Sequence, residues 1–288
     1  MPDLGELLRD ARRRLTAAAL PSPDADAVQL AAHVLGTTPG DVRARAARGA
    51  EVRPHQADQF ALLVGERTAR VPLQHLTGTA PFRTLELSVG PGVFTPRPET
   101  EVVAGIAIDE AHRLTSPLVV DLCAGSAAIA VAVAVEVPAA RVAAVELDVI
   151  AIGFATSNVR QFAPHVDLRL GSAVRADTGV LADYAGEVDV VVANPPYIPP
   201  GMEPVDPEVA EHEPPLALYG GGDDGLEVPR GVVASAAGLL RPGGLLVMEH
   251  ADAQGPATRA LVAGPGWGDV RTVDDLTGRP RALVARRQ

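Results

Sequence analysis

From residue 116 to the end, short apolar runs alternate with longer segments whose apolar residues recur at helical spacing. Strands are predicted at residues 118–123, 141–147, 166–170, 188–194, 243–250, 269–273 and 281–287. Between them we expect helices at 126–135, 149–160 and 254–262, and one ending at Leu240. This order predicts a mostly parallel, seven-stranded sheet with helices on both faces. Ligands then bind at the carboxyl ends of the strands, at the topological switch point.

The part before this alternation has a different pattern. Leucine and alanine recur at helical spacing through residues 4–15, another helix is bounded by Ser22 and Gly36, and a third surrounds Phe60. We therefore expect a helical bundle over residues 1–72, which is either a packing module or a substrate-docking domain. Residues 73–96 alternate and contain several glycines, which favours a β-hairpin linker. Residues 97–288 then form the α/β domain.

Composition excludes several classes of protein. The chain of 288 residues carries a formal charge of -11, which argues against binding to a nucleic-acid backbone. Its single cysteine, Cys123, forbids an internal disulfide and is typical of a reducing compartment. The apolar run at 127–135 is far shorter than the ~20 residues of a membrane span. We expect a cytoplasmic protein with no metal and no membrane or nucleic-acid partner.

The loop after the first strand of the sheet, residues 121–127, reads D-L-C-A-G-S-A. A dinucleotide-binding loop needs three glycines, partly so that its backbone can approach a pyrophosphate, and this loop has only Gly125. S-adenosylmethionine (SAM) has no pyrophosphate. It requires a tight turn and a carboxylate for its ammonium group, which Asp121 could supply directly or through water.

Glu146 ends the second strand, roughly 20 residues beyond the loop, at the spacing of a ribose-hydroxyl acceptor. Alternatively, Asp121 and Glu146 only cap turns. Their occurrence at the ends of two adjacent strands favours a nucleotide site. Cys123 is more typical of a small buried residue than of a nucleophile, because no histidine is near it in sequence.

The fourth strand ends in V-V-V-A-N-P-P-Y, residues 190–197. Asn-Pro is a common turn, but it can also hold a weakly nucleophilic nitrogen. The Asn194 oxygen and the Pro195 carbonyl could accept the two N–H bonds of an amide and place its nitrogen about 3 Å from a methyl donor. Proline has no N–H, and its fixed φ holds that carbonyl in place. Tyr197 offers a flat face to a planar amide or base.

N-P-P-Y after the fourth strand resembles SAM-dependent methyltransferases that act on amide or amine nitrogens. Four further stretches are similar to the PrmC/HemK family, which methylates the glutamine of the Gly-Gly-Gln motif in peptide chain release factors. They are P-L-Q-H-L-T-G at 72–78, G-V-F-T-P-R-P-E-T-E at 92–101, E-P-P-L-A-L-Y-G-G-G-D-D-G-L at 213–226 and P-G-G-L-L-V-M-E-H at 242–250. The resemblance covers nearly the whole chain. It implies a Rossmann-like class I SAM-dependent methyltransferase domain with a small N-terminal helical bundle and a hairpin linker.

The resemblance also implies roles for individual residues. Asp121, the loop and Glu146 would hold SAM, with residues 172 and 173 against its adenine and Asn194 at the methyl group. Asn194, Pro195, Pro196 and Tyr197 would hold the substrate glutamine. Phe94 and Arg97 would lie in a loop that closes over the site, and Glu213 would form a wall of the glutamine pocket. The loop comprises Cys123, Ala124, Gly125, Ser126 and Ala127. Cys123 and Ala127 stand at its outer positions, where the family usually has glycine. Ser172 and Ala173 stand where the family usually has an acidic residue and a larger apolar or aromatic one.

Alternatives remain open. A DNA adenine-N6 methyltransferase or an enzyme for another protein glutamine shares the central chemistry, and a SAM-binding module could have lost catalysis. A nicotinamide-dependent oxidoreductase is disfavoured by the glycine-poor loop. Arg97 and Glu99 could simply form a solvated ion pair. His250 more often has a structural role than that of a base.

Overall fold

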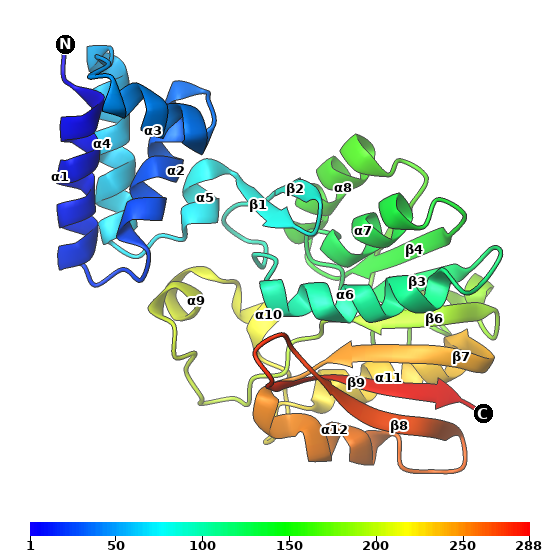
Figure 1. Ribbon diagram of the computed structural model, residues 1–288. Coiled ribbons are helices and arrows are strands. Elements are labelled where there is room, and N and C mark those ends of the chain that lie inside the picture. Colours follow the sequence, from blue (N-terminus) through cyan, green and yellow to red (C-terminus); the bar gives the residue numbers. More distant parts are fainter. The chain divides into compact units, whose positions relative to one another are not determined.

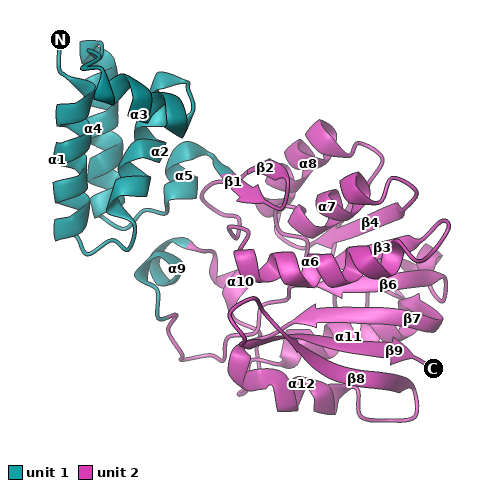
Figure 2. Ribbon diagram, in the orientation of Figure 1, with its two compact units in different colours: residues 1–79, 205–212 teal, residues 80–204, 213–288 magenta.

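The computed structural model describes residues 1–288 and divides them into two compact units (Figure 2). The helical unit contains Met1–Thr79 and Val205–His212, and the sheet unit contains Ala80–Pro204 and Glu213–Gln288. The segment 205–212 therefore belongs to the helical unit, although both of its ends continue into the sheet unit. None of the helices combines the length and apolar character needed to cross a bilayer.

The helical unit is a bundle around one hydrophobic core (Figure 1). Four of its helices begin with proline, and Gly36 ends α2 with a left-handed φ of 59°. The helices predicted around residues 4–15, 22–36 and 57–64 are confirmed, whereas α3 and α5 were not predicted, because they are short and bury few side chains. The elements are α1 (Leu4–Ala17), α2 (Pro23–Leu35), α3 (Pro39–Ala47), α4 (Pro54–Thr68), α5 (Leu73–Thr77) and α9 (Pro207–His212).

A buried ion-pair cluster holds α9 within this unit. The Arg67 guanidinium donates to Asp26 over 2.8 Å and to Glu208, on α9, also over 2.8 Å. Arg70 adds a second contact to Glu208 at 3.3 Å. Removal of one member of such a cluster would leave an unpaired buried charge, which is strongly destabilising.

The sheet unit begins with a hairpin of β1 (Thr79–Phe82, whose first residue lies in the helical unit) and β2 (Leu85–Ser88). Its seven-stranded sheet has the order β5-β4-β3-β6-β7-β9-β8, in which β9 runs antiparallel to both of its neighbours and the other pairs are parallel. The predicted mostly parallel, seven-stranded sheet is confirmed. The strands are β3 (Leu118–Leu122), β4 (Arg141–Glu146), β5 (Asp167–Leu170), β6 (Val188–Ala193), β7 (Leu240–Glu249), β8 (Trp267–Asp274) and β9 (Pro280–Arg287).

Alternate residues of the strands point to two separate cores, as the two-residue period of a strand requires. One core packs under α6 (Pro98–Ala111), α7 (Ala128–Glu136) and α8 (Ala151–Phe162), and the other under α11 (Glu227–Leu239) and α12 (Gly255–Leu261) (Figure 1). Short helical turns complete the unit: η1 (Ala182–Tyr184), α10 (Pro215–Leu218) and η2 (Asp252–Gln254).

Helix α6 was not predicted, although it begins with Pro98 and has Glu99 and Glu101 in its first turn. Its buried face is built largely of alanine and valine, which gives a weak helical pattern. This helix carries Thr100 to the carboxyl edge of the sheet, beside Asn194 and Glu249.

The register of the parallel strands brings four polar side chains to one edge. Leu122 of β3 pairs with Val145 of β4 and with Ala193 of β6, and Ala193 pairs with Met248 of β7. Asp121, Glu146, Asn194 and Glu249 lie within one residue of these positions, because each ends or adjoins its strand. The carboxyl edge of the sheet is therefore the candidate site.

Candidate functional site at the carboxyl edge of the sheet

The loop after β3 is a tight turn that leads into α7. Its Ala124 N–H donates to the Val145 carbonyl over 2.9 Å, and its Ala127 N–H donates to the Ala124 carbonyl over 2.7 Å. Cys123, Gly125 and Ala127 have left-handed φ values of 65°, 58° and 62°. Two non-glycine residues thus adopt a conformation that glycine tolerates best, a strain that clusters at functional loops.

Glu146 fastens this loop from the neighbouring strand. One carboxylate oxygen accepts from the Gly125 N–H over 2.6 Å, and the other accepts from the Asp148 N–H over 2.7 Å. Burial raises the pKa of Glu146 above its ordinary range. Because each carboxylate oxygen has two lone pairs, the side chain retains the capacity to accept two hydroxyl groups of a ribose.

Asp121 lies beneath the start of α7 and is almost fully buried. Its Oδ2 accepts from the Ala130 N–H over 3.0 Å, whereas its Oδ1 is buried without a hydrogen-bond partner. Burial raises its pKa to about 8. A buried carboxylate oxygen without a partner is costly, and an ammonium group would supply the missing donor. The carboxylate acceptors of this half of the site therefore fit SAM, whose ammonium group and ribose diol are donors.

The residues predicted at the adenine lie beside Glu146, since the Gly171 N–H donates to the Glu146 carbonyl over 2.8 Å. Ser172 is exposed and its hydroxyl accepts from the Val174 N–H. Ala173 is buried. Neither presents a charged group at this position.

Cys123 and His250 show no sign of acid–base or nucleophilic chemistry. Burial raises the pKa of the partly buried Cys123 thiol, which therefore stays protonated. Burial lowers the pKa of His250, whose Nδ1 lies 2.7 Å from the Ala251 carbonyl and whose buried Nε2 has no partner. No cluster of three potential metal ligands was found.

The N-P-P-Y segment is held by contacts on both sides. Asn194 Nδ2 donates to the Thr100 hydroxyl over 3.2 Å. The Tyr197 N–H donates to the Leu218 carbonyl over 3.2 Å, and the Tyr197 carbonyl accepts from Gln254 Nε2 over 2.8 Å. No group of the chain donates a hydrogen bond to Asn194 Oδ1 or to the Pro195 carbonyl.

Behind this segment lies the buried carboxylate of Glu249. The Thr100 hydroxyl donates to one of its oxygens over 2.7 Å, and the Tyr197 hydroxyl approaches the other at 3.4 Å. Burial raises the pKa of Glu249 to about 7, while Arg281 acts in the opposite direction. Thr100, Gln254, Glu249 and Arg281 were not predicted as site residues. Glu249 alone carried a signal, because it ends a strand as Glu146 does.

Two glycines of the stretch after α10 also pack on the N-P-P-Y backbone. A β-carbon on Gly220 would overlap the Gly225 carbonyl oxygen and lie 2.6 Å from the Pro196 carbonyl oxygen. One on Gly225 would overlap the Tyr197 carbonyl oxygen and lie 2.7 Å from the Pro199 nitrogen. Side chains at either position would displace the segment that carries Asn194. The glycines of this stretch therefore permit a close approach of two backbones.

Glu213 anchors the loop that precedes α6. Its buried carboxylate accepts from the Thr95 N–H at 3.2 and 3.3 Å and from Arg97 at 2.9 Å. The Arg97 guanidinium also lies over the Phe94 ring, 5.3 Å from its centre. The alternative of a solvated ion pair between Arg97 and Glu99 is therefore wrong, because Arg97 is paired with a buried acid elsewhere in the chain.

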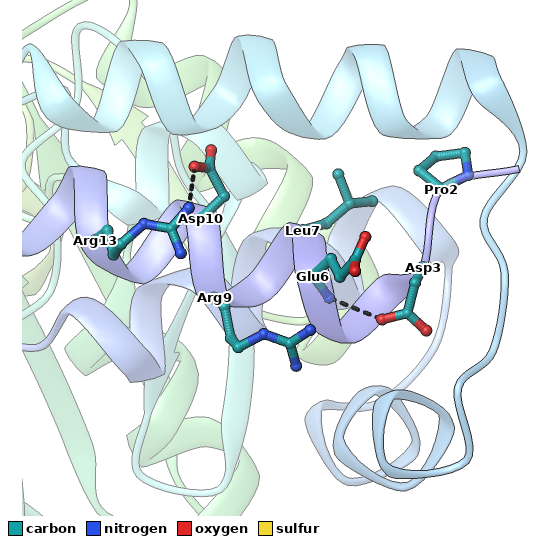
Figure 3. Close-up of a pocket in the computed structure, with 7 residues that line it drawn as sticks. All are labelled: Pro2, Asp3, Glu6, Leu7, Arg9, Asp10 and Arg13. Carbon is teal, nitrogen blue, oxygen red and sulfur yellow. Dashed lines mark hydrogen bonds and ion pairs between the residues drawn. The ribbon is translucent and has the colours of Figure 1, made fainter.

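A hollow on the first helix of the helical unit is lined by charged side chains, several of which make local contacts (Figure 3). Asp3 accepts the Glu6 N–H as a helix cap, and Asp10 pairs with Arg13 at 2.8 Å. Asp3, Asp10 and Arg13 are thus used in local helix contacts.

Comparisons with known proteins agree with this geometry. The family described as PrmC N-terminal domain matches residues 6–78, and the methyltransferase small domain matches residues 85–206. A release factor glutamine methyltransferase of Streptomyces coelicolor is 46% identical over 96% of this chain and 95% of that protein. Another, of Bifidobacterium longum, is 40% identical over 97% of this chain and 98% of that protein.

Among solved structures, the Thermus thermophilus 16S rRNA N2 G1207 methyltransferase RsmC superimposes with a TM-score of 0.51. The two are 20% identical, and the match covers 73% of this chain and 50% of that one. The strand order, the loop after β3 and the acid that ends β4 define a class I methyltransferase. Within that class, full-length identity places the chain in the family of release factor glutamine methyltransferases.

Proposed function

We propose that this protein transfers a methyl group from SAM to the side-chain amide nitrogen (N5) of the glutamine in the Gly-Gly-Gln motif of a peptide chain release factor. The names of relatives that are 46% and 40% identical over nearly their whole length support this substrate. One observation carries the proposal: Asn194 gives its NH2 group to Thr100, so that its oxygen remains available as an acceptor beside the Pro195 carbonyl.

In the first half of the site, the residues bind and orient the cofactor. Glu146 would accept the ribose hydroxyls, the buried Oδ1 of Asp121 would accept the ammonium, and the loop would follow the amino-acid part. Ser172 and Ala173 would lie at the adenine. When bound, SAM supplies an electrophilic methyl group on a sulfonium. The loop concerned comprises Cys123, Ala124, Gly125, Ser126 and Ala127.

In the second half, the residues hold the acceptor. The Asn194 oxygen and the Pro195 carbonyl would accept the two N–H bonds of the glutamine amide, with Pro196 keeping the segment rigid and the Tyr197 ring beneath the amide plane. This grip favours a pyramidal nitrogen and stabilises the positive charge that develops on it. The product then loses its extra proton, so no strong base is needed before transfer. Asn194 would also lie against the cofactor's reacting end.

The loop of Phe94 and Arg97 would cover the entrance, with Glu213 as its anchor and a pocket wall. We further propose that the region 1–72 docks the release factor, 73–96 serves as a linker, and 97–288 carries out the transfer. The matched N-terminal family and the exposed position of most arginines in α1 and α3 are compatible with a docking role.

The test is mass spectrometry of a release factor after incubation with the protein and SAM. We expect one added methyl group on the glutamine of the Gly-Gly-Gln peptide. A release factor in which asparagine replaces this glutamine should remain unmodified. Methylation of another peptide alone would overturn the proposed substrate.

Two alternatives have distinct outcomes in the same assay. The first alternative is a DNA adenine methyltransferase, which the charge of -11 disfavours. It is tested by incubating duplex DNA with the protein and labelled SAM. Incorporation of label into DNA alone would replace our proposal. Tight SAM binding in calorimetry without any product would instead indicate a binding module that has lost catalysis.

A further inference from the structure

We propose that Glu249 is a positioning residue that fixes the orientation of the Asn194 amide through the hydroxyl of Thr100. The inference rests on the proposed function, because it explains how the acceptor oxygen of Asn194 comes to face the substrate amide. Glu249 is expected to touch neither substrate nor cofactor. It lies behind the N-P-P-Y segment, at the end of the adjacent strand β7.

The argument follows from which groups can donate a hydrogen bond. An ionised carboxylate can only accept, so the Thr100 hydroxyl must give its single proton to Glu249, at 2.7 Å. The Thr100 oxygen can then only accept from Asn194, at 3.2 Å. Asn194 must therefore turn its NH2 group toward Thr100, and its Oδ1 toward the other side. Each hydrogen bond in the series Glu249–Thr100–Asn194 therefore determines the direction of the next one.

Without this series of hydrogen bonds, nothing would distinguish the two ends of the Asn194 amide, because they are nearly equivalent in shape. A flipped amide would present NH2 to the substrate amide, where two donors would face each other. The orientation thus decides whether the side chain binds the substrate nitrogen or repels it. Valine has nearly the shape of threonine and no hydroxyl, so it would remove this control while keeping the packing.

Glu249 has no ion-pair partner at salt-bridge distance, and two hydroxyl groups hold it instead. The groups that face it are Thr100 and Glu99 from α6, Tyr197 from the loop after β6, and Arg281 from β9. Arg281 favours the ionised form, whereas Glu99 opposes it. Burial outweighs both and raises the pKa of Glu249 to about 7.

Protonation of Glu249 would allow the hydrogen bonds between Glu249, Thr100 and Asn194 to reverse their direction. A carboxylic acid can donate to the Thr100 oxygen, and the hydroxyl can then donate to a flipped Asn194 oxygen. The turnover number should therefore rise with pH through about 7 and level off above it. Tyr197 does not titrate in this range, because burial raises its pKa, and His250 stays neutral, because burial lowers its pKa.

Asp121 also has a pKa raised to about 8, so the two carboxyl groups must be separated. Asp121 belongs to the cofactor half and should affect the KM for SAM. Glu249 acts on the acceptor half and should affect kcat at saturating SAM and release factor. The pH profile of kcat under saturation is therefore the measurement that reports on Glu249.

The test compares Thr100→Val with Thr100→Ser in the full-length protein, with wild type in parallel. We expect Thr100→Val to lower kcat by about tenfold or more while SAM affinity by calorimetry changes less than about twofold. Thr100→Ser keeps the hydroxyl and should remain within about threefold of wild type. Thermal unfolding of both variants shows whether the fold is retained.

Glu249→Gln supplies the pH readout, because the amide keeps the shape but does not ionise. We expect a lower kcat and loss of the inflection near pH 7 in this variant. Retention of wild-type kcat by Thr100→Val, equal losses in Thr100→Val and Thr100→Ser, or a persistent inflection in Glu249→Gln would overturn the proposal. A flat kcat profile of wild type from about pH 6 to about 8.5 would overturn it even if the variants do not fold. Failure of wild type to methylate the release factor would instead overturn the proposed function itself.

Discussion

The two halves of the site use buried strand-end carboxylates in different ways. At β3 and β4, Asp121 and Glu146 accept hydrogen bonds from backbone N–H groups of Ala130, Gly125 and Asp148. At β6 and β7, Glu249 accepts from side chains. Backbone donors are present whatever the residue, whereas side-chain donors must be specified at distant positions. The cofactor half can thus tolerate Cys123 and Ala127 in its loop, while the acceptor half depends on particular side chains.

The largest expected effect is on turnover, and it comes from a change in the acceptor half alone. Asn194→Ala removes an acceptor that is used mainly in the transition state, so turnover should fall more than about 100-fold, or ~2.7 kcal/mol. SAM affinity, measured by calorimetry, should stay nearly unchanged. A loss of turnover below about tenfold would mean that the substrate amide is not held in this way.

Gly220→Ala tests whether the acceptor half depends on backbone packing as well. The new methyl would overlap the Gly225 carbonyl and meet the Pro196 carbonyl, so we expect a loss of about 2 kcal/mol in the free energy of unfolding and a marked fall in turnover. Denaturant unfolding and initial rates measure the two effects. Gly264→Ala is the matched control, because a β-carbon there meets nothing within 4 Å. Equal behaviour of the two variants would contradict the close approach.

Glu146→Gln addresses the cofactor half. Glutamine has only one acceptor oxygen for the two N–H groups that Glu146 binds, and it loses the charge that favours a diol. We expect SAM affinity to fall about tenfold, or ~1.4 kcal/mol, with kcat at saturating SAM nearly retained. The exposed Glu187→Gln should leave both quantities at wild-type values. A fall in kcat without a change in affinity would reverse the assignment of the two halves.

The last prediction concerns stability, namely the cost of keeping Asp121 buried. Its pKa is raised from 3.8 to about 8, so the folded protein without cofactor prefers the protonated form. Its stabilising contribution is complete below about pH 4 and declines as pH rises toward about 8. Asp121→Asn should flatten this decline between pH 5 and 8, as followed by denaturant unfolding. Parallel stability curves for the two proteins would contradict the shift.

Sequence patterns predicted the sheet and the strand-end residues well. Asp121 and Glu146 lie at the ends of their strands and Asn194 follows its strand, and the parallel register brings such positions together without further information. The backing of Asn194 was not predictable in this way. Thr100 lies 94 residues earlier, on a helix whose small apolar residues gave a weak pattern, and Glu249 lies 55 residues later. A network of side chains from separate elements leaves no periodic signal in the sequence.

Because the segment 205–212 belongs to the helical unit, the protein cannot be divided into its two units at one position. Because the chain passes between the two units at 79/80, 204/205 and 212/213, no single cut separates them. A fragment that begins at Ala80 would carry Glu208 without Arg67 and Arg70. The loop between N-P-P-Y and Glu213 would then lose these ion pairs. The two units thus alternate along the sequence. An insertion or deletion in α4 would move Arg67 and so change its ion pair with Glu208, on the segment 205–212.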